Sequence, residues 1–343
     1  MKWLHTFMLV LGAVFLGYLV SRIGIRELWH QLTLLGWGLV PLILLEGVAD
    51  LFHAIGWRCC LLGPHRSLSL LRIFRIRMAG FAVNYLTPTA SFGGEVTKAA
   101  LLASDQRGPD AVSAVLIGKL CFSLAHLLFV MIGSALVLWR IPLPGTLWGA
   151  MLISSTLMTA GMAAFLLIQK HGKVGGLIRW LVARHIGGQS LKGFARGISD
   201  VDEALKLFHR ERQGDLPRAV LWHLIGYSMG ILQAWVFFRC VAPDASLAVA
   251  ASVFFIGMWF DLILFAVPTN VGVLEWSRVL TLKAVGGSAS TGMTYGVAIR
   301  LAQLFWAGFG LVNYALLASA SGKPPETRAP DGETGSRNLP ESR

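Results

Sequence analysis

Three ionisable residues of one apolar segment share a helix face. Glu46, Asp50 and His53 lie at positions i, i+4 and i+7 of the segment 37–57, and an α-helix brings residues with this spacing to one side. Charged groups at membrane depth are costly, and they are by default functional. Two interpretations follow. The three residues form a polar pathway or couple to proton movement, or the two acids are neutral or paired with a buried base and only hold helices together.

Polar residues also surround an interruption in the apolar segment 78–103. The interruption and its flanks hold Asn84, Pro88, Gly93, Gly94, Glu95 and Lys98. Irregular backbone at membrane depth is tolerated only where protein or a water-filled cavity surrounds it. Paired glycines let a ligand approach closely, and a helix that begins there directs free N–H groups at an anion. We therefore expect an anionic group such as a lipid phosphate to bind here. The alternative is that Glu95 is only a helix-start acid stabilised by the macrodipole.

A second interruption, in the apolar segment 247–285, repeats part of this pattern. It holds Pro268, Gly272, Glu275 and Arg278, and Asp261 precedes it. Both interruptions read Pro-Thr, five residues, an acid, two residues, a base, which favours a shared substrate site. Asp261 is assigned to the polar pathway. The alternative is that Glu275 and Arg278, three residues apart on a helix, pair only with each other.

Arg300 lies about eight residues into the last apolar segment, 292–318, too deep for its side chain to reach the interface comfortably. It needs an acidic partner, for which Asp261 and Glu275 are the candidates, or an anionic ligand. His126, in another apolar segment, is interpreted as a hydrogen-bonded packing residue.

The composition decides the class of protein. The chain has 343 residues, of which 55% are hydrophobic and 14% charged, whereas a soluble domain usually carries about 25% charged residues. Despite a net charge of +12, this excludes a cytosolic enzyme, a nucleic-acid-binding module and a disordered chain. Four cysteines show no CxxC pair and no His at zinc spacing, so no disulfide, metal site or cofactor is predicted.

We predict an all-α integral membrane protein, a polytopic helical bundle. A spanning helix needs about 20 mostly apolar residues. Such segments, two of them interrupted, are 4–20, 37–57, 78–103, 111–139, 147–168, 219–241, 247–285 and 292–318. The membrane domain is 1–318, and the proline-rich tail 319–343 is predicted to be disordered.

The basic residues predict the orientation. Most of the 30 Lys and Arg residues become cytoplasmic if both termini are cytoplasmic and each interrupted segment enters and leaves on one side as a re-entrant hairpin. The Arg-rich loop 58–77 and the basic segment 169–218 are then cytoplasmic. This arrangement makes 37–139 and 219–318 inverted-topology repeats, and inverted repeats with broken helices form the substrate sites of secondary transporters.

Several motifs resemble those of a known family. The run from Asn84 to Pro88 with Glu95 and Lys98 is similar to the Asn, Pro, Gly-Glu, Arg motif of the lysylphosphatidylglycerol synthase transmembrane family, also called the flippase-like family. The second interruption is similar to that family's second motif, and Tyr295 with Arg300 to its Tyr-Arg motif. Lys98, and Lys119 in the segment 111–139, stand where Arg is expected. The tail is too short for the soluble synthase domain, so the resemblance implies the lipid-translocating part alone.

Together these features favour a lipid transporter of the cytoplasmic membrane that is not an enzyme. Its partner is a lipid, for which an anionic phospholipid, a polyprenyl-linked sugar and a hopanoid-type lipid all suit. The alternatives are an intramembrane enzyme that uses Glu46, Asp50 and His53 as acid and base, and a non-catalytic subunit working with enzymes of lipid synthesis.

Overall fold

The computed structural model describes residues 35–87, 92–105, 110–170, 214–241, 244–264 and 273–321, and a few single residues between 26 and 33. All regular structure in these ranges is helical, which confirms the predicted class. Four helices there are long and apolar enough to cross a membrane: Gly36–Cys59, Ala111–Arg140, Asp215–Val241 and Ala289–Ser319. The segment 4–20, most of the basic segment 169–218 and nearly all of the tail 319–343 lie outside the described residues.

The helices follow the apolar segments of the sequence. They are α3 (Leu39–Cys59), α4 (Leu70–Leu86), α5 (Phe92–Asp105), α6 (Asp110–Arg140), α7 (Gly145–Lys170), α10 (Asp215–Val241), α11 (Leu247–Leu264), α12 (Val273–Ala284) and α13 (Ala289–Ser321). Two short 3-10 turns, η1 (Gly36–Gly38) and η2 (Gly63–Ser67), flank α3. Large apolar side chains such as those of Leu136, Phe305 and Val312 are exposed, as expected for surfaces that contact lipid.

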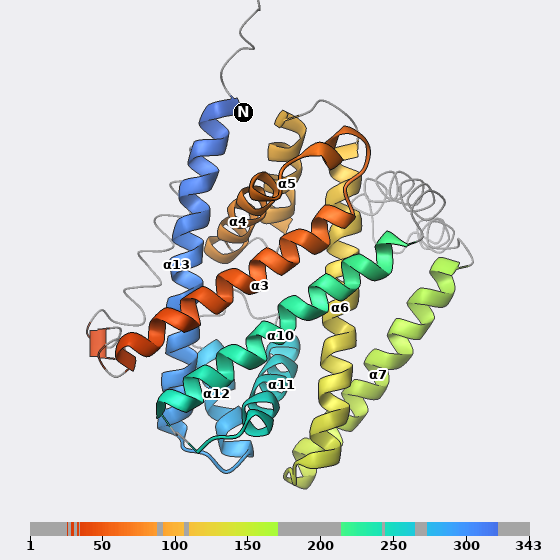
Figure 1. The fold of residues 1–343 in the computed structure, drawn as a ribbon. Coiled ribbons are helices and arrows are strands. Elements are labelled where there is room, and N and C mark those ends of the chain that lie inside the picture. The colour runs from red at the N-terminus through yellow and green to blue at the C-terminus, as the bar shows by residue number, and fades with distance from the viewer. Residues whose placement is uncertain are drawn as a thin grey trace, which may run out of the picture.

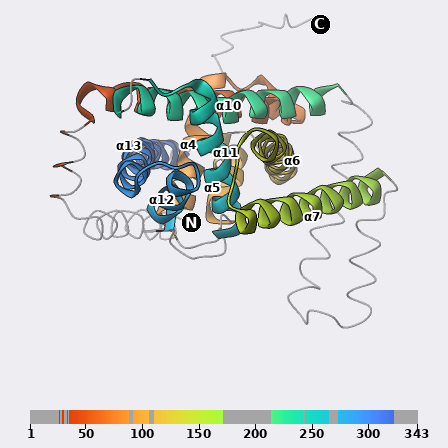
Figure 2. The same ribbon diagram turned by 90° about the horizontal axis from the view of Figure 1, so that it is seen from below.

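Helices α3 and α10 pack lengthwise across one side of the bundle (Figures 1 and 2). In Figure 1, α3 runs from the lower left to the upper right, and α10 runs beside it in the opposite direction. The Gln233 amide of α10 donates a hydrogen bond of 2.8 Å to the Leu42 carbonyl of α3. Trp306 of α13 donates one of 2.7 Å to the Ile43 carbonyl, so α3 is also fixed to α13.

Four of the remaining helices form two short pairs with one long helix, α13, beside both, and α6 and α7 lie on the side of the bundle away from α13 (Figure 1). The pair α4 and α5 lies toward one end of the molecule, the pair α11 and α12 toward the other, and α13 extends past both (Figure 1). Two glycines of α13 make this packing possible, because they let its backbone approach α4 and α12 closely. A Cβ on Gly310 of α13 would collide with the Met78 carbonyl of α4, and one on Gly296 would come within 2.8 Å of the Glu275 Cα of α12.

One expectation about this region is wrong. The sequence assigned residues 58–77 to an Arg-rich cytoplasmic loop, but α4 begins at Leu70 and includes the last three of those arginines. The Ser69 hydroxyl caps the helix by accepting a hydrogen bond from the Arg72 backbone N–H. Arg75 donates a hydrogen bond of 2.6 Å to Asn313 of α13, and Arg77 pairs with Asp50 of α3. These long-range partners allow basic side chains to lie within the bundle.

Candidate functional site

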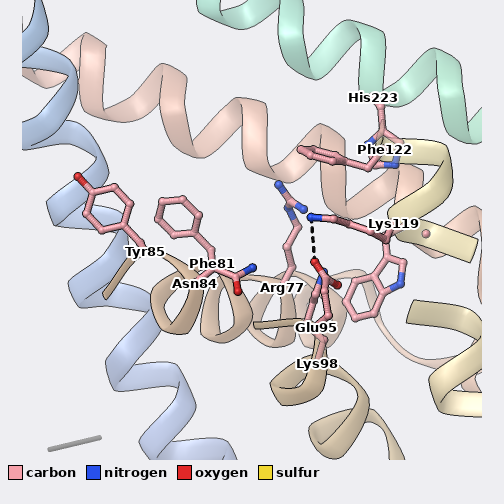
Figure 3. A pocket seen from close by; sticks show the side chains of 11 residues that line it. Arg77, Phe81, Asn84, Tyr85, Glu95, Lys98, Lys119, Phe122 and His223 are labelled. Carbon is pink, nitrogen blue, oxygen red and sulfur yellow. Dashed lines mark ion pairs between the residues drawn. The ribbon is translucent and has the colours of Figure 1, made fainter. Parts of the chain in front are cut away.

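A cavity of about 270 Å³ lies where α3, α4, α5, α6 and α10 meet (Figure 3). It is lined by Trp57, Arg77, Phe81, Asn84, Tyr85, Glu95, Lys98, Gly118, Lys119, Phe122 and His223. Three of these residues are cations and one is an acid, and we call this space the cationic cavity. Ligand pockets measure roughly 300–1,000 Å³, so the cavity has room for a headgroup rather than a whole lipid.

The cations of this cavity surround a single carboxylate. Glu95 pairs with Lys98 on its own helix and, at 3.3 Å, with Lys119 of α6. Lys98 also lies 5.4 Å from the ring centroid of Trp57, a cation–π contact. Because Glu95 is shared between two ammonium groups and Arg77 adds a third cation, the cavity favours an additional anion.

The first turn of α5 is held against α4 by the residues that the sequence singled out. The Gly94 backbone N–H donates a hydrogen bond of 2.6 Å to the Asn84 side-chain oxygen. A Cβ on Gly94 would collide with the Gly80 carbonyl and the Asn84 amide, so only glycine permits this approach. Thr97 fixes the same turn through a hydrogen bond of 2.8 Å to the Gly93 carbonyl. Asn84 therefore positions Glu95 and Lys98 at the cavity.

A second cavity of about 280 Å³ lies between α3, α10, α11, α12 and α13. Its ionisable lining residues include Glu46, Asp50, His53, Asp261, Arg77 and Arg278. Because three of these side chains, Glu46, Asp50 and Asp261, are carboxylates, we call this space the acidic cavity. The Glu46 carboxylate accepts a hydrogen bond of 3.1 Å from Gln233. The Arg278 guanidinium donates to both Asp261 oxygens, at 3.1 and 2.6 Å.

The two cavities share a boundary. Arg77, Phe81 and Phe122 line both of them. The Arg77 guanidinium donates a hydrogen bond of 2.7 Å to Asp50 and lies 5.5 Å from the Phe122 ring centroid. A charged group that passes between the cavities must therefore pass this arginine and its two aromatic neighbours.

Arg300 has its acidic partner on α12. Its side chain is 2% exposed, and it donates hydrogen bonds of 2.8 and 3.0 Å to the two Glu275 oxygens and one of 3.2 Å to the Tyr85 hydroxyl. Of the two candidate partners, Glu275 is thus the one found, and Asp261 pairs with Arg278 instead. Glu275 and Arg278 each have a partner on another helix, so the alternative that they serve only each other is wrong. Neither Glu275 nor Arg300 lines the cationic or the acidic cavity.

The predicted site residues that the structure describes fall into three groups. Asn84, Glu95 and Lys98 lie at the cationic cavity, and Glu46, Asp50, His53, Asp261 and Arg278 at the acidic cavity. Gly93, Gly94, Glu275 and Arg300 shape or fix the surrounding helices. Pro88, Pro268 and Gly272 lie outside the described residues.

Sequence reasoning did not select four residues that the structure places here: Arg77, Lys119, His223 and Gln233. The sequence places Arg77 in the predicted Arg-rich loop 58–77, and Lys119 differs only from the Arg expected in the family motif. A signal for His223 does exist, because His-x-Ile-Gly occurs both at residues 53–56 and at 223–226.

A helical membrane protein with charged side chains enclosed between its spans is the class that this geometry defines. A family model described as Lysylphosphatidylglycerol synthase TM region matches residues 6–310, and the chain belongs to this family. No curated protein and no solved structure matches the chain. The family and the apolar helices together identify a lipid-related membrane protein.

Proposed function

We propose that this protein moves the headgroup of an anionic or glycan-bearing lipid across the cytoplasmic membrane through the cationic and acidic cavities. The observation that carries the proposal is that two charged cavities inside the bundle share one boundary, formed by Arg77, Phe81 and Phe122. Enclosed charges cost free energy in a membrane protein and mark substrate or ion pathways. Each cavity is large enough for a headgroup but not for a whole lipid, so the acyl chains stay in the surrounding bilayer.

The opposite charges of the cavities define the headgroup chemistry. A phosphate is suited to the cationic cavity, where Lys98 and Lys119 already flank a carboxylate. Hydroxyl or amino groups are suited to the acidic cavity, where Glu46 and Asp261 offer carboxylate oxygens. Phospholipids, polyprenyl-linked sugars and hopanoid-type lipids with such groups are the candidate substrates.

The proposal includes two inverted repeats, α3 to α6 and α10 to α13, each with a re-entrant hairpin. Three observations support it. Helices α3 and α10 run in opposite directions, and the α4–α5 and α11–α12 pairs lie at opposite ends (Figure 1). The acid at the start of α5 pairs with a base of α6, as the acid at the start of α12 pairs with a base of α13.

The orientation places both termini and the α4–α5 end in the cytoplasm. Its support is the sequence asymmetry, because Arg58 lies in the last turn of α3, Arg66 in η2 and Arg72 in the first turn of α4. The connection from α3 to α4 lies at the α4–α5 end of the bundle (Figure 1). Positive charge near span ends is retained on the cytoplasmic side. Enzymes of lipid synthesis on that side are the proposed partners that deliver the substrate.

The test is headgroup translocation by the purified protein in vesicles that contain lipids with a fluorescent headgroup. A membrane-impermeant reductant bleaches the outer leaflet alone if the protein is inactive, and both leaflets if it translocates. We expect bleaching of both leaflets for at least one lipid with a phosphate. Bleaching of the outer leaflet alone for phospholipid, aminoacylated and polyprenyl-phosphate lipids would overturn the proposal. A lipid whose mass changes would instead favour an intramembrane enzyme.

A matched pair of variants on α6 sharpens this test. Lys119→Gln removes one cation of the cationic cavity, whereas Arg140→Gln removes an exposed cation at the end of the same helix. A hydrogen bond to a charged group contributes about 1.5–3 kcal/mol, so we expect a roughly tenfold or larger loss of translocation for Lys119→Gln. Arg140→Gln should translocate like the wild type. Equal rates for the two variants would show that the cationic cavity does not hold the headgroup.

A further inference from the structure

Two buried histidines meet where α3 and α10 pack together. The Nδ1 atoms of His53 and His223 lie 3.1 Å apart, and the two residues are 7% and 1% exposed. His53 lines the acidic cavity and His223 lines the cationic cavity. The pair thus reaches from one cavity to the other, beside the boundary that Arg77, Phe81 and Phe122 form.

Each histidine ring lies against a glycine of the opposite helix. A Cβ on Gly56 of α3 would lie 2.8 Å from the His223 ring, and one on Gly226 of α10 would lie 2.7 Å from the His53 ring. The repeated His-x-Ile-Gly at residues 53–56 and 223–226 therefore acts reciprocally, with each helix supplying one ring and the space for the other. This reciprocity fixes the two rings in contact.

The contact between the two Nδ1 atoms allows only two arrangements of the hydrogens in the neutral pair. One Nδ1 must donate and the other must accept, so one ring carries its hydrogen on Nδ1 and the other on Nε2. The His223 Nε2 is buried at the cationic cavity and has no hydrogen-bond partner among the described residues. A buried ring nitrogen of this kind is available to a proton donor that enters the cavity.

We propose that His53 and His223 form a proton relay that couples headgroup translocation to proton movement between the cavities; this rests on the proposed function. In the arrangement that has the hydrogens on the His223 Nδ1 and the His53 Nε2, a proton binds the His223 Nε2, and the hydrogen on the His223 Nδ1 passes to the His53 Nδ1. The hydrogen on the His53 Nε2 then leaves into the acidic cavity. One proton enters and one leaves, and the tautomers of both rings are exchanged.

The acidic cavity contains a proton acceptor on the helix face that carries His53. Asp50 is held by Arg77. Glu46 lies two turns before His53, lines the same cavity and accepts a hydrogen bond from the neutral Gln233 amide. It is therefore the carboxylate that we assign to receive the proton.

Charged and titratable groups on every neighbouring helix face the pair. Asp50 on α3, Arg77 on α4, Lys98 on α5 and Lys119 on α6 line the cavities that the two rings line. His126 on α6 and Tyr227 on α10 lie close to His53. Most of these side chains influence how readily the pair takes up a proton, so most are unsuitable as test positions. His65 of η2 is also buried, is not among these groups and lines neither cavity, which makes it the matched control.

The test measures translocation of a fluorescent phospholipid headgroup in vesicles that also contain a trapped pH-sensitive dye. If one proton moves per headgroup, a gradient of about one pH unit shifts the steady-state distribution of the headgroup about tenfold in the wild type. In His223→Asn, the side-chain amide can occupy the Nδ1 position but has no second ring nitrogen. In this variant we expect the same headgroup distribution with and without the gradient, whereas His65→Asn should respond to the gradient like the wild type.

The outcomes separate the relay from the proposed function. No translocation by the wild type under any gradient would remove the proposed function itself. The relay alone would be overturned if the pH gradient did not change the headgroup distribution in the wild type. It would also be overturned if His223→Asn responded to the gradient like the wild type. If His223→Asn does not fold, the wild type still decides the question. The relay requires the trapped dye to report a change of pH inside the vesicles as soon as headgroup translocation begins. A constant dye signal during translocation contradicts the relay.

Discussion

Replacing Glu275 with Gln is expected to destabilise the folded protein by about 3–5 kcal/mol, the cost of removing one partner from a buried ion pair. The Arg300 guanidinium, with a side chain that is 2% exposed, would then face a neutral amide in place of the carboxylate that accepts two of its hydrogen bonds. Because this pair joins α12 to α13, we expect the loss to appear in the thermal denaturation of the purified protein.

The control for this change is an ion pair whose cation is exposed. Arg218 pairs with Asp215 at 3.4 Å with a side chain that is 73% exposed, so Arg218→Gln should cost less than about 1 kcal/mol. A similar denaturation temperature for Glu275→Gln and Arg218→Gln would contradict the structural role of the buried pair.

A double variant separates a structural pair from a ligand site. Well-packed apolar residues can replace a buried ion pair without loss of stability, so Glu275→Leu with Arg300→Met should recover much of the stability that the single change loses. The pair lines neither cavity, and we therefore expect the double variant to retain headgroup translocation. A stable but inactive double variant would assign the pair to substrate binding.

Replacing Arg77 with Gln is expected to reduce headgroup translocation roughly ten- to a hundredfold, since hydrogen bonds to charged groups contribute about 1.5–3 kcal/mol. The substitution removes the cation shared by both cavities and leaves the Asp50 carboxylate without its guanidinium, where it would repel a passing phosphate. Initial rates of headgroup bleaching in vesicles measure the effect.

Two further variants identify the cause of that loss. Arg77→Gln combined with Asp50→Asn removes the uncompensated carboxylate and should restore part of the rate. Arg66 is exposed on η2 and lines neither cavity, so Arg66→Gln should translocate like the wild type. If Arg77→Gln were as active as Arg66→Gln, the shared boundary would not lie on the headgroup path.

The spanning helices could be predicted from the sequence because apolar length is a local signal. The segment 37–57 corresponds to α3 (Leu39–Cys59), and 219–241 to α10 (Asp215–Val241). The start of α4 could not be predicted in this way. Its arginines resembled a cytoplasmic loop, and only their partners Asp50 and Asn313, far away in the sequence, explain why they lie within the bundle.

The sequence could predict the types of residue that form the candidate site, but it could not predict which acidic and basic side chains pair with each other. Spacing placed Glu46, Asp50 and His53 on one face, and they do line one cavity. The choice of Glu275 over Asp261 for Arg300 depends on how α12 packs against α13, which no local pattern contains. His223 was missed because a single histidine in an apolar segment is inconspicuous, and only the repeat of His-x-Ile-Gly at residues 53–56 and 223–226 connects it with His53.

Photo-crosslinking with a phospholipid that carries a reactive group on its headgroup tests most directly whether the headgroup passes through both cavities. We predict adducts on residues that line the cationic cavity, such as Asn84 and Lys119, and on residues that line the acidic cavity, such as Gln233 and Tyr295. Excess unlabelled phospholipid should reduce the adducts at both places. Adducts confined to outward-facing side chains such as Leu136 and Phe305 would contradict the account.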